Sequence, residues 1–424
     1  MPEVLLNKKG TDPRALSEAL AFINDGEFRT FGDYMRGWLK ERMTMWGPYL
    51  SEHKAKDGRA MPPVDPKLWP TMICAFENQL SVSPRLRGRD YESAIFETTT
   101  RSDIQFPVKV SLPIVRDVFP LMFMNRVCGL QPMPPQSGGT MNIFYKKTYR
   151  TDVSPTTALT TTDSDYPSGS ESSVPKRLNT VITKETVTAQ KFILNATYTQ
   201  EVLEDLAGAH GINLEREMLD DMSGEILRCI EQIVLKEMYD NASAGTVTWS
   251  WTKPDTETGY GVTEYYQTLY HAFIDAERLV RAARHRECNY IVAGLGVVTY
   301  LKKSNWFTLD PSSAAQGPIS SGVRREGRFG LWDVYSTPYL SDNTSFISYY
   351  PLSMTHAGYI FCPYIPLMPM PRVYGSMKAY DDETMPGAYT NEDTWNQNVR
   401  TRFGKKMVQA DMFAKVNIQE AAVE

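Results

Sequence analysis

Few residues in this chain of 424 have the types and spacing that chemistry requires. Gly294 and Gly296 follow a predicted strand and precede a predicted helix, as the first glycines of a dinucleotide-binding loop do. The third glycine of that motif, which allows close packing of the helix, is replaced by Thr299, so we favour a plain strand-to-helix turn. His285 and Cys288 supply only two of the four ligands that a structural zinc ion needs. We therefore predict no cofactor-binding and no metal-binding residues.

Hydrolytic chemistry has no better support. The sequence has neither a G-x-S-x-G motif nor a grouping of Ser, His and Asp that indicates acyl transfer. Arg324, Arg325 and Arg328 cluster in a Gly-, Ser- and Pro-rich segment, residues 305–330, which we predict to be a solvated or partner-facing loop rather than a phosphate site. Isolated carboxylates are numerous but cannot be paired from sequence, so a soluble hydrolase with an unrecognised site stays an alternative. We predict no catalytic residues and favour a protein that is not an enzyme.

The composition indicates an ordered globular chain. Hydrophobic residues make up 42% of it, and the formal net charge of -5 disfavours tight binding to nucleic-acid phosphates. The five cysteines are scattered without a C-x-x-C pair, so we expect buried free thiols. The N-terminus lacks a secretory signal, and no apolar run is long enough to cross a bilayer. We expect a soluble protein that is made in a cytoplasm and contacts no membrane.

The elements that position these residues are organised around one predicted helix. Apolar residues recur at three- and four-residue steps from Asn213, a good N-cap, to Asp240. At about 1.5 Å per residue this helix is roughly 40 Å long, so we interpret it as the spine of the subunit. We expect a second helix at 263–285 and a buried strand at 288–294, and the mixture without a βαβ rhythm predicts an α+β fold. Further strands are expected at 331–336, 346–350, 358–370 and 399–418.

The N-terminal residues 1–110 are predicted to form a loose arm of short helices with little core of its own. Its clearest apolar stripe is Met35, Trp38, Leu39 and Trp46. Such a stripe needs another surface to cover it, either of a neighbour or of the same chain.

A two-stranded ribbon is predicted from strands at 141–150 and 179–198, which flank a polar tip at 151–173. Neither strand shows the one-sided alternation of a strand that lies on its own core. Because an isolated two-stranded ribbon is marginally stable, we predict that this one lies on another subunit.

Four stretches carry a resemblance to a known family. They are LPIVRDVFPLMFMNRVCGLQPM (112–133), ATYTQEVLEDLAGAHGINLEREM (196–218), NYIVAG (289–294) and HAGYIFCPYIPLMPM (356–370). In this order the chain resembles the major capsid proteins of tailed bacteriophages with the Hong Kong 97-type fold, and in detail their T-even-type branch. The implied α+β parts are an N-terminal arm (1–110), an entry to the peripheral domain (111–141), an extended two-stranded loop (142–198), a peripheral domain (199–286) with the spine helix (213–240), an axial domain (287–395) and C-terminal return strands (396–424).

The resemblance implies a structural protein of the virion that self-assembles into pentamers and hexamers. These would form the icosahedral head of a tailed phage around double-stranded DNA, without sequence specificity, in the cytoplasm of a bacterial host. The implied partners are other copies of the chain, portal and scaffolding proteins and, as a further candidate, a decoration protein. An encapsulin-like nanocompartment shell is the nearest alternative. The inter-subunit contacts that we expect are Trp38, Trp46, Tyr149, Asp165, Lys176, Arg177, Arg324 and Arg325.

Two modifications known in relatives are not expected here. Some relatives form a Lys to Asn cross-link between subunits, for which Lys176 is the candidate, but no placed carboxylate is evident to promote it. T-even-type relatives lose an N-terminal segment to a maturation protease. Because this chain is given from Met1, we do not expect that cleavage.

Overall fold

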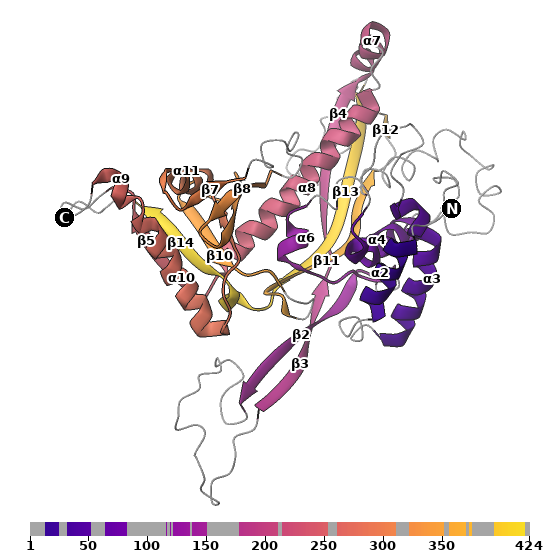
Figure 1. Ribbon diagram of the computed structural model, residues 1–424. Coiled ribbons are helices and arrows are strands. Elements are labelled where there is room, and N and C mark those ends of the chain that lie inside the picture. Colours follow the sequence, from indigo (N-terminus) through magenta and orange to yellow (C-terminus); the bar gives the residue numbers. More distant parts are fainter. Residues whose placement is uncertain are drawn as a thin grey trace, which may run out of the picture.

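The computed structural model contains two sheets, a projecting ribbon and a group of N-terminal helices, arranged around one long helix (Figure 1). The described residues are 13–24, 32–51, 64–82, 116, 119, 122–135, 138–150, 178–210, 214–252, 261–310, 322–351, 356–369, 373–374 and 394–419.

The long helix, α8 (Leu214–Asp240), runs as a rod through the middle of the molecule and confirms the predicted spine. It ends where the Asn241 side-chain amide donates to the Glu237 carbonyl oxygen at 2.9 Å, which satisfies one of the free carbonyls of the last turn. None of the described helices is both long enough and apolar enough to span a membrane. The buried apolar face of α8 consists of Leu219, Met222, Ile226, Leu227, Ile230, Val234, Leu235 and Met238.

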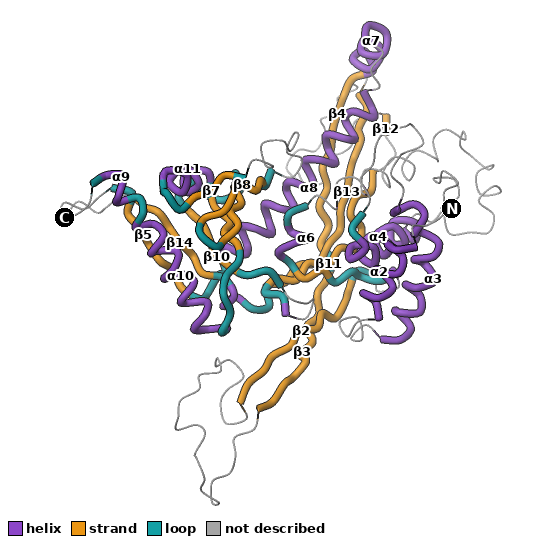
Figure 2. The backbone as a smooth tube through the Cα atoms, in the orientation of Figure 1, coloured by secondary structure: helices purple, strands orange, loops and turns teal. Residues whose placement is uncertain are grey.

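A five-stranded sheet, here called the spine sheet, lies along α8 (Figures 1 and 2). Its strands are β1 (Gly129–Leu130), β4 (Gln190–Thr199), β11 (Tyr359–Pro369), β12 (Val373–Tyr374) and β13 (Thr394–Met407). The order is β1-β11-β13-β12, and β4 also pairs with β13, antiparallel over its whole length. The short helices α6 (Met124–Val127) and α7 (Gln200–His210) precede β1 and α8 respectively.

The second sheet has seven strands in the order β5-β14-β10-β6-β9-β8-β7. Their bounds are β5 (Gly245–Ser250), β6 (Tyr290–Ala293), β7 (Phe307–Leu309), β8 (Arg324–Phe329), β9 (Trp332–Ser336), β10 (Thr344–Ser348) and β14 (Ala414–Gln419). The helical segments with it are α9 (Val262–Tyr265), α10 (Thr268–Arg284), α11 (Leu295–Lys303) and η9 (Ala410–Met412). The predicted α+β class is therefore confirmed, although the helix expected at 263–285 is divided into α9 and α10.

The strand pairing divides the chain differently from the predicted domain limits. α10, expected in the peripheral domain, packs its buried face on the seven-stranded sheet, and the Trp249 indole on β5 donates to the Thr268 hydroxyl at its start at 2.9 Å. β11, expected in the axial domain, belongs to the spine sheet, and β14 lies inside the other sheet between β5 and β10. The chain thus crosses between the sheets several times, because hydrogen-bond partners far apart in sequence decide where each strand lies.

The ribbon consists of β2 (Thr140–Arg150) and β3 (Leu178–Thr188), which pair antiparallel over all eleven residues of each strand. The strand predicted at 179–198 is interrupted at Ala189, and its second half is β4 of the spine sheet. Near the body of the subunit the ribbon does alternate: Met141 and Ile143 are buried and Asn142 is exposed. The buried side chains of this ribbon base pack with Ile360, Cys362 and Tyr364 of β11, so the expected lack of a one-sided pattern is wrong there.

The N-terminal helices α2 (Pro13–Asn24), α3 (Gly32–Ser51), η2 (Pro66–Leu68) and α4 (Trp69–Val82) pack together beside the spine sheet (Figure 1). The side-chain amide of Asn78 donates to the Met133 carbonyl oxygen at 2.8 Å, and that of Gln79 to the Leu367 carbonyl oxygen at 2.7 Å. These bonds and a shared hydrophobic core attach the helices to their own subunit.

This packing corrects the expectation for Trp46. Its side chain is 1% exposed, its ring lies 5.1 Å from that of Phe76, and its indole N–H donates to Glu77 at 2.8 Å. Trp46 is thus an intrasubunit core residue and not a contact to a neighbour. Trp38 packs half-buried against the same core.

Candidate functional site

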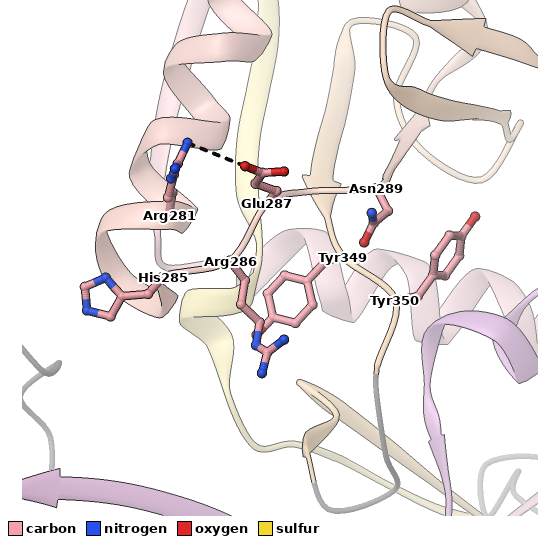
Figure 3. Close-up of a pocket in the computed structure, with 7 residues that line it drawn as sticks. All are labelled: Arg281, His285, Arg286, Glu287, Asn289, Tyr349 and Tyr350. Carbon is pink, nitrogen blue, oxygen red and sulfur yellow. Dashed lines mark ion pairs between the residues drawn. The ribbon is translucent and has the colours of Figure 1, made fainter.

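An open hollow of about 330 Å³ lies where α10 ends and the chain turns into β6 (Figure 3). His285 makes the turn in the left-handed conformation, with φ of 55°, and its backbone N–H donates to the Arg281 carbonyl oxygen at 2.7 Å. The lining residues are Arg281, His285, Arg286, Glu287, Asn289, Tyr349 and Tyr350.

The polar groups of this hollow do not converge on one point. Arg281 and Glu287 form an exposed ion pair at 3.7 Å, and in Figure 3 His285 and Arg286 point away from Tyr350. The Tyr350 hydroxyl lies 2.8 Å from that of Tyr335, and burial raises the pKa of Tyr350. A nucleophile within hydrogen-bond reach of a general base is not found among these lining residues.

His285 and Cys288, the two candidate zinc ligands, lie in different environments. Cys288 is buried and its backbone N–H donates to the Glu277 carboxylate at 2.9 Å, whereas His285 is exposed. Burial raises the pKa of the Cys288 thiol, which disfavours the thiolate form that binds metals. No group of three or more His, Cys, Asp or Glu that could hold a metal ion occurs in the described part of the chain. The free thiols of Cys74, Cys128, Cys288 and Cys362 are buried as predicted, but that of Cys229 is exposed.

Gly294 lies in the predicted strand-to-helix turn between β6 and α11, and Gly296 is the second residue of α11. Gly294 is the N-cap of α11, and a Cβ atom at this position would lie 2.2 Å from the Ser341 carbonyl oxygen. At Gly296 a Cβ atom would lie 2.7 Å from the Asp342 carbonyl oxygen. Both glycines are thus required by backbone packing, which confirms the turn.

The arginine cluster lies on strand β8 and not in a loop, which corrects that prediction. Arg325 donates to Asp310 at 2.7 Å and to Asp333 at 2.8 Å, and Arg328 donates to Asp333 at 3.0 Å. Although burial alone would raise the pKa of Asp333, these hydrogen bonds lower it. Arg325 is therefore engaged within its own subunit, and its expected inter-subunit contact stays a prediction. Arg324 is half-buried on the same strand.

The remaining expected contacts lie on the ribbon. Tyr149 is on β2, where its backbone is paired with that of Asn179. Asp165, Lys176 and Arg177 lie outside the described residues. The outer ribbon, defined here as residues 146–150 and 178–182, projects from the subunit (Figure 1), and its Ile182 side chain is 56% exposed.

Two acidic residues of α8 are functional candidates that the sequence reading missed. Glu231 is 1% exposed and accepts a hydrogen bond from the Phe123 backbone N–H at 2.6 Å. Glu237 forms an ion pair with Lys405 and accepts a hydrogen bond from the Tyr359 hydroxyl at 2.8 Å. The signal for Glu231 was its spacing, because it lies four residues from Leu227 and four from Leu235, within the buried face.

The geometry therefore describes a subunit with a projecting ribbon, and the residues that line its hollow do not form a convergent chemical site. The profile of the family "Major capsid protein Gp23" matches residues 136–385. The chain belongs to this family of tailed-phage major capsid proteins, and the predicted Hong Kong 97-type capsid fold and T-even-type branch are confirmed. Its family is one of structural virion proteins and not of enzymes, so the encapsulin-like and hydrolase alternatives are set aside.

Solved phage structures also match. That of Microbacterium phage Oxtober96 is 13% identical, with a TM-score of 0.42 over 69% of this chain and 90% of that one. The capsid of Myoviridae phage XM1 is 8% identical, with a TM-score of 0.40 over 70% of this chain and 92% of that one. The capsid of cyanophage P-SCSP1u is 8% identical, with a TM-score of 0.41 over 71% and 89%. At these scores the likeness adds nothing to the family assignment. The comparison with curated proteins gives no match.

Proposed function

We propose that this capsid protein forms pentamers and hexamers that tile an icosahedral head around double-stranded DNA, with the outer ribbon of each subunit lying across an adjacent copy. The observation that carries the proposal is the ribbon itself. Its base packs into the core of its own subunit, while the strands of the outer ribbon pair only with each other among the described residues. A two-stranded ribbon of this kind is marginally stable in water unless a further surface supports it.

The charge of the chain fits a container for DNA. With a formal net charge of -5, a shell of such subunits would not hold phosphates tightly, which favours both packaging and release. In this proposal the head assembles in a bacterial cytoplasm, and its protein partners are a portal and scaffolding proteins. A decoration protein is a further candidate partner. The same proposal places the finished protein in the virion.

The test is Ile182→Asp in the outer ribbon, with Ile193→Asp as the matched control. Ile193 lies on β4 of the spine sheet and is 53% exposed, close to the 56% of Ile182. Both changes are at exposed sites, so each unassembled subunit should keep a free energy of unfolding within about 0.5 kcal/mol of the parent. Burying an aspartate in a subunit interface is costly, so Ile182→Asp should lower the yield of particles in sedimentation by about tenfold or more. Normal particles from Ile182→Asp, or an equal loss from both variants, would count against the ribbon as the contact.

A further inference from the structure

The carboxyl group of Glu231 is buried in the middle of α8, and only one of its two oxygens has a hydrogen-bond partner among the described residues. One oxygen accepts the Phe123 backbone N–H at 2.6 Å, while the other, Oε2, is buried without a hydrogen-bond partner among the described residues. Glu237, six residues further along the same helix, is instead paired with Lys405 and Tyr359. An ionised carboxylate is costly to bury without such partners. The surroundings of Glu237 therefore stabilise a negative charge, whereas those of Glu231 do not.

The bond from Phe123 lies at the joint between the two sheets. The Phe123 ring packs 4.4 Å from the ring of Tyr335 on β9 and 6.5 Å from that of Tyr290 on β6, both in the seven-stranded sheet. Phe119, Met122 and Met124 line one small cavity together with Leu227 and Ile230 of α8 and with Phe361 and Phe403 of the spine sheet. The Glu231 carboxyl group therefore binds the backbone of a segment that packs between α8 and the seven-stranded sheet.

The groups that face Glu231 do not compensate a negative charge on it. Burial and the Glu231 charge both raise the pKa of Cys128 in the 122–128 segment. Burial, and after it the Glu231 charge, raise the pKa of Tyr339, which follows β9, to about 12. On α8 itself, Arg228 is half exposed and paired with Glu225 at 3.2 Å. Burial raises the pKa of Glu231 to about 8, although the bond from Phe123 opposes this shift. The carboxyl group is thus mostly protonated at neutral pH.

We propose that Glu231 is a proton-operated latch, which holds α8 against the 122–128 segment and the seven-stranded sheet while its carboxyl group is protonated and releases that joint when the proton is lost. The protonated group keeps its bond to Phe123 and buries no charge. The ionised group buries a charge with one hydrogen bond, and opening the joint hydrates it. The latch belongs to the single subunit and does not require assembly.

The direction of the pH effect follows from the two states. In the closed joint Glu231 titrates near pH 8, and in the opened joint it titrates near its ordinary value of 4.5. The closed state therefore binds one more proton between these values, and its stability falls as the pH rises through this window. The equilibrium constant for opening should rise about tenfold per pH unit between about pH 5 and pH 8, and level off above that.

The experiment measures hydrogen exchange of a peptide covering 122–128 in the unassembled full chain, divided by the intrinsic exchange rate, from about pH 5 to about pH 9. The parent should show the tenfold rise per unit, whereas Glu231→Gln, which keeps the acceptor oxygen and cannot ionise, should be flat. Glu225→Gln on the exposed face of α8 should behave as the parent. Equal pH dependence of the parent and Glu231→Gln would overturn the latch. If Glu231→Gln does not fold, the infrared band of a protonated carboxyl in the parent decides: its presence at pH 7 and loss by about pH 9 supports the latch, and its absence at pH 7 refutes it.

Discussion

The N-terminal helices and the ribbon both pack against the spine sheet, yet their apolar side chains are covered to different extents within the subunit. In the helices, Trp46, Trp69 and Phe76 are buried within the subunit. In the ribbon, only one face is buried near the body: Ile143 lies on that face and is fully buried, while Ile182 lies on the opposite face and is 56% exposed. An apolar stripe in a sequence thus shows that a surface will be covered but does not show which molecule covers it.

The largest effect that sharpens this comparison is expected for Trp46→Ala. Removing this fully packed ring should lower the free energy of unfolding of the unassembled subunit by about 3 to 5 kcal/mol. Met45→Ala on the same helix is the control, because Met45 is 38% exposed and its truncation should cost far less. Chemical denaturation followed by circular dichroism measures both. A Trp46→Ala subunit as stable as the parent would mean that the N-terminal helices are held by neighbours after all.

A somewhat smaller effect is expected for Ile143→Ala at the ribbon base. Ile143 packs with β11 in the second hydrophobic cluster, so the subunit should lose about 2 to 4 kcal/mol. Ile182→Ala in the outer ribbon should change the stability of the unassembled subunit by no more than about 0.5 kcal/mol. Equal losses at the two positions would show that Ile182 is packed in the unassembled subunit as firmly as Ile143, and would contradict its exposure in the outer ribbon.

The sequence predicted those parts of the fold that follow from the local spacing of apolar residues. The spine helix was found because its apolar face repeats over 27 residues, and β6 and α11 because a short apolar run is followed by a capping glycine and a helical pattern. Gly294 was also assigned correctly to a turn, since an incomplete glycine motif is better explained by backbone packing.

The predictions that were wrong concern features that depend on contacts between residues far apart in the sequence. The break at Ala189 separates β3 from β4 because β4 finds its partner in β13, about two hundred positions later, and no local pattern marks this. Arg325 was predicted to lie in a solvated or partner-facing loop, since the sequence does not show that Asp310 and Asp333 face it from neighbouring segments. Glu231 was visible as a spacing, but its single partner is a backbone N–H in another segment.

The most direct test of the central claim compares hydrogen exchange in assembled shells and in unassembled subunits. If the outer ribbon lies across a neighbour, peptides covering 146–150 and 178–182 should gain strong protection on assembly. Peptides from α3, which holds Trp46, should be equally protected in both states, because their core lies within the subunit. An outer ribbon that exchanges at the same rate in shells and in subunits would contradict the account.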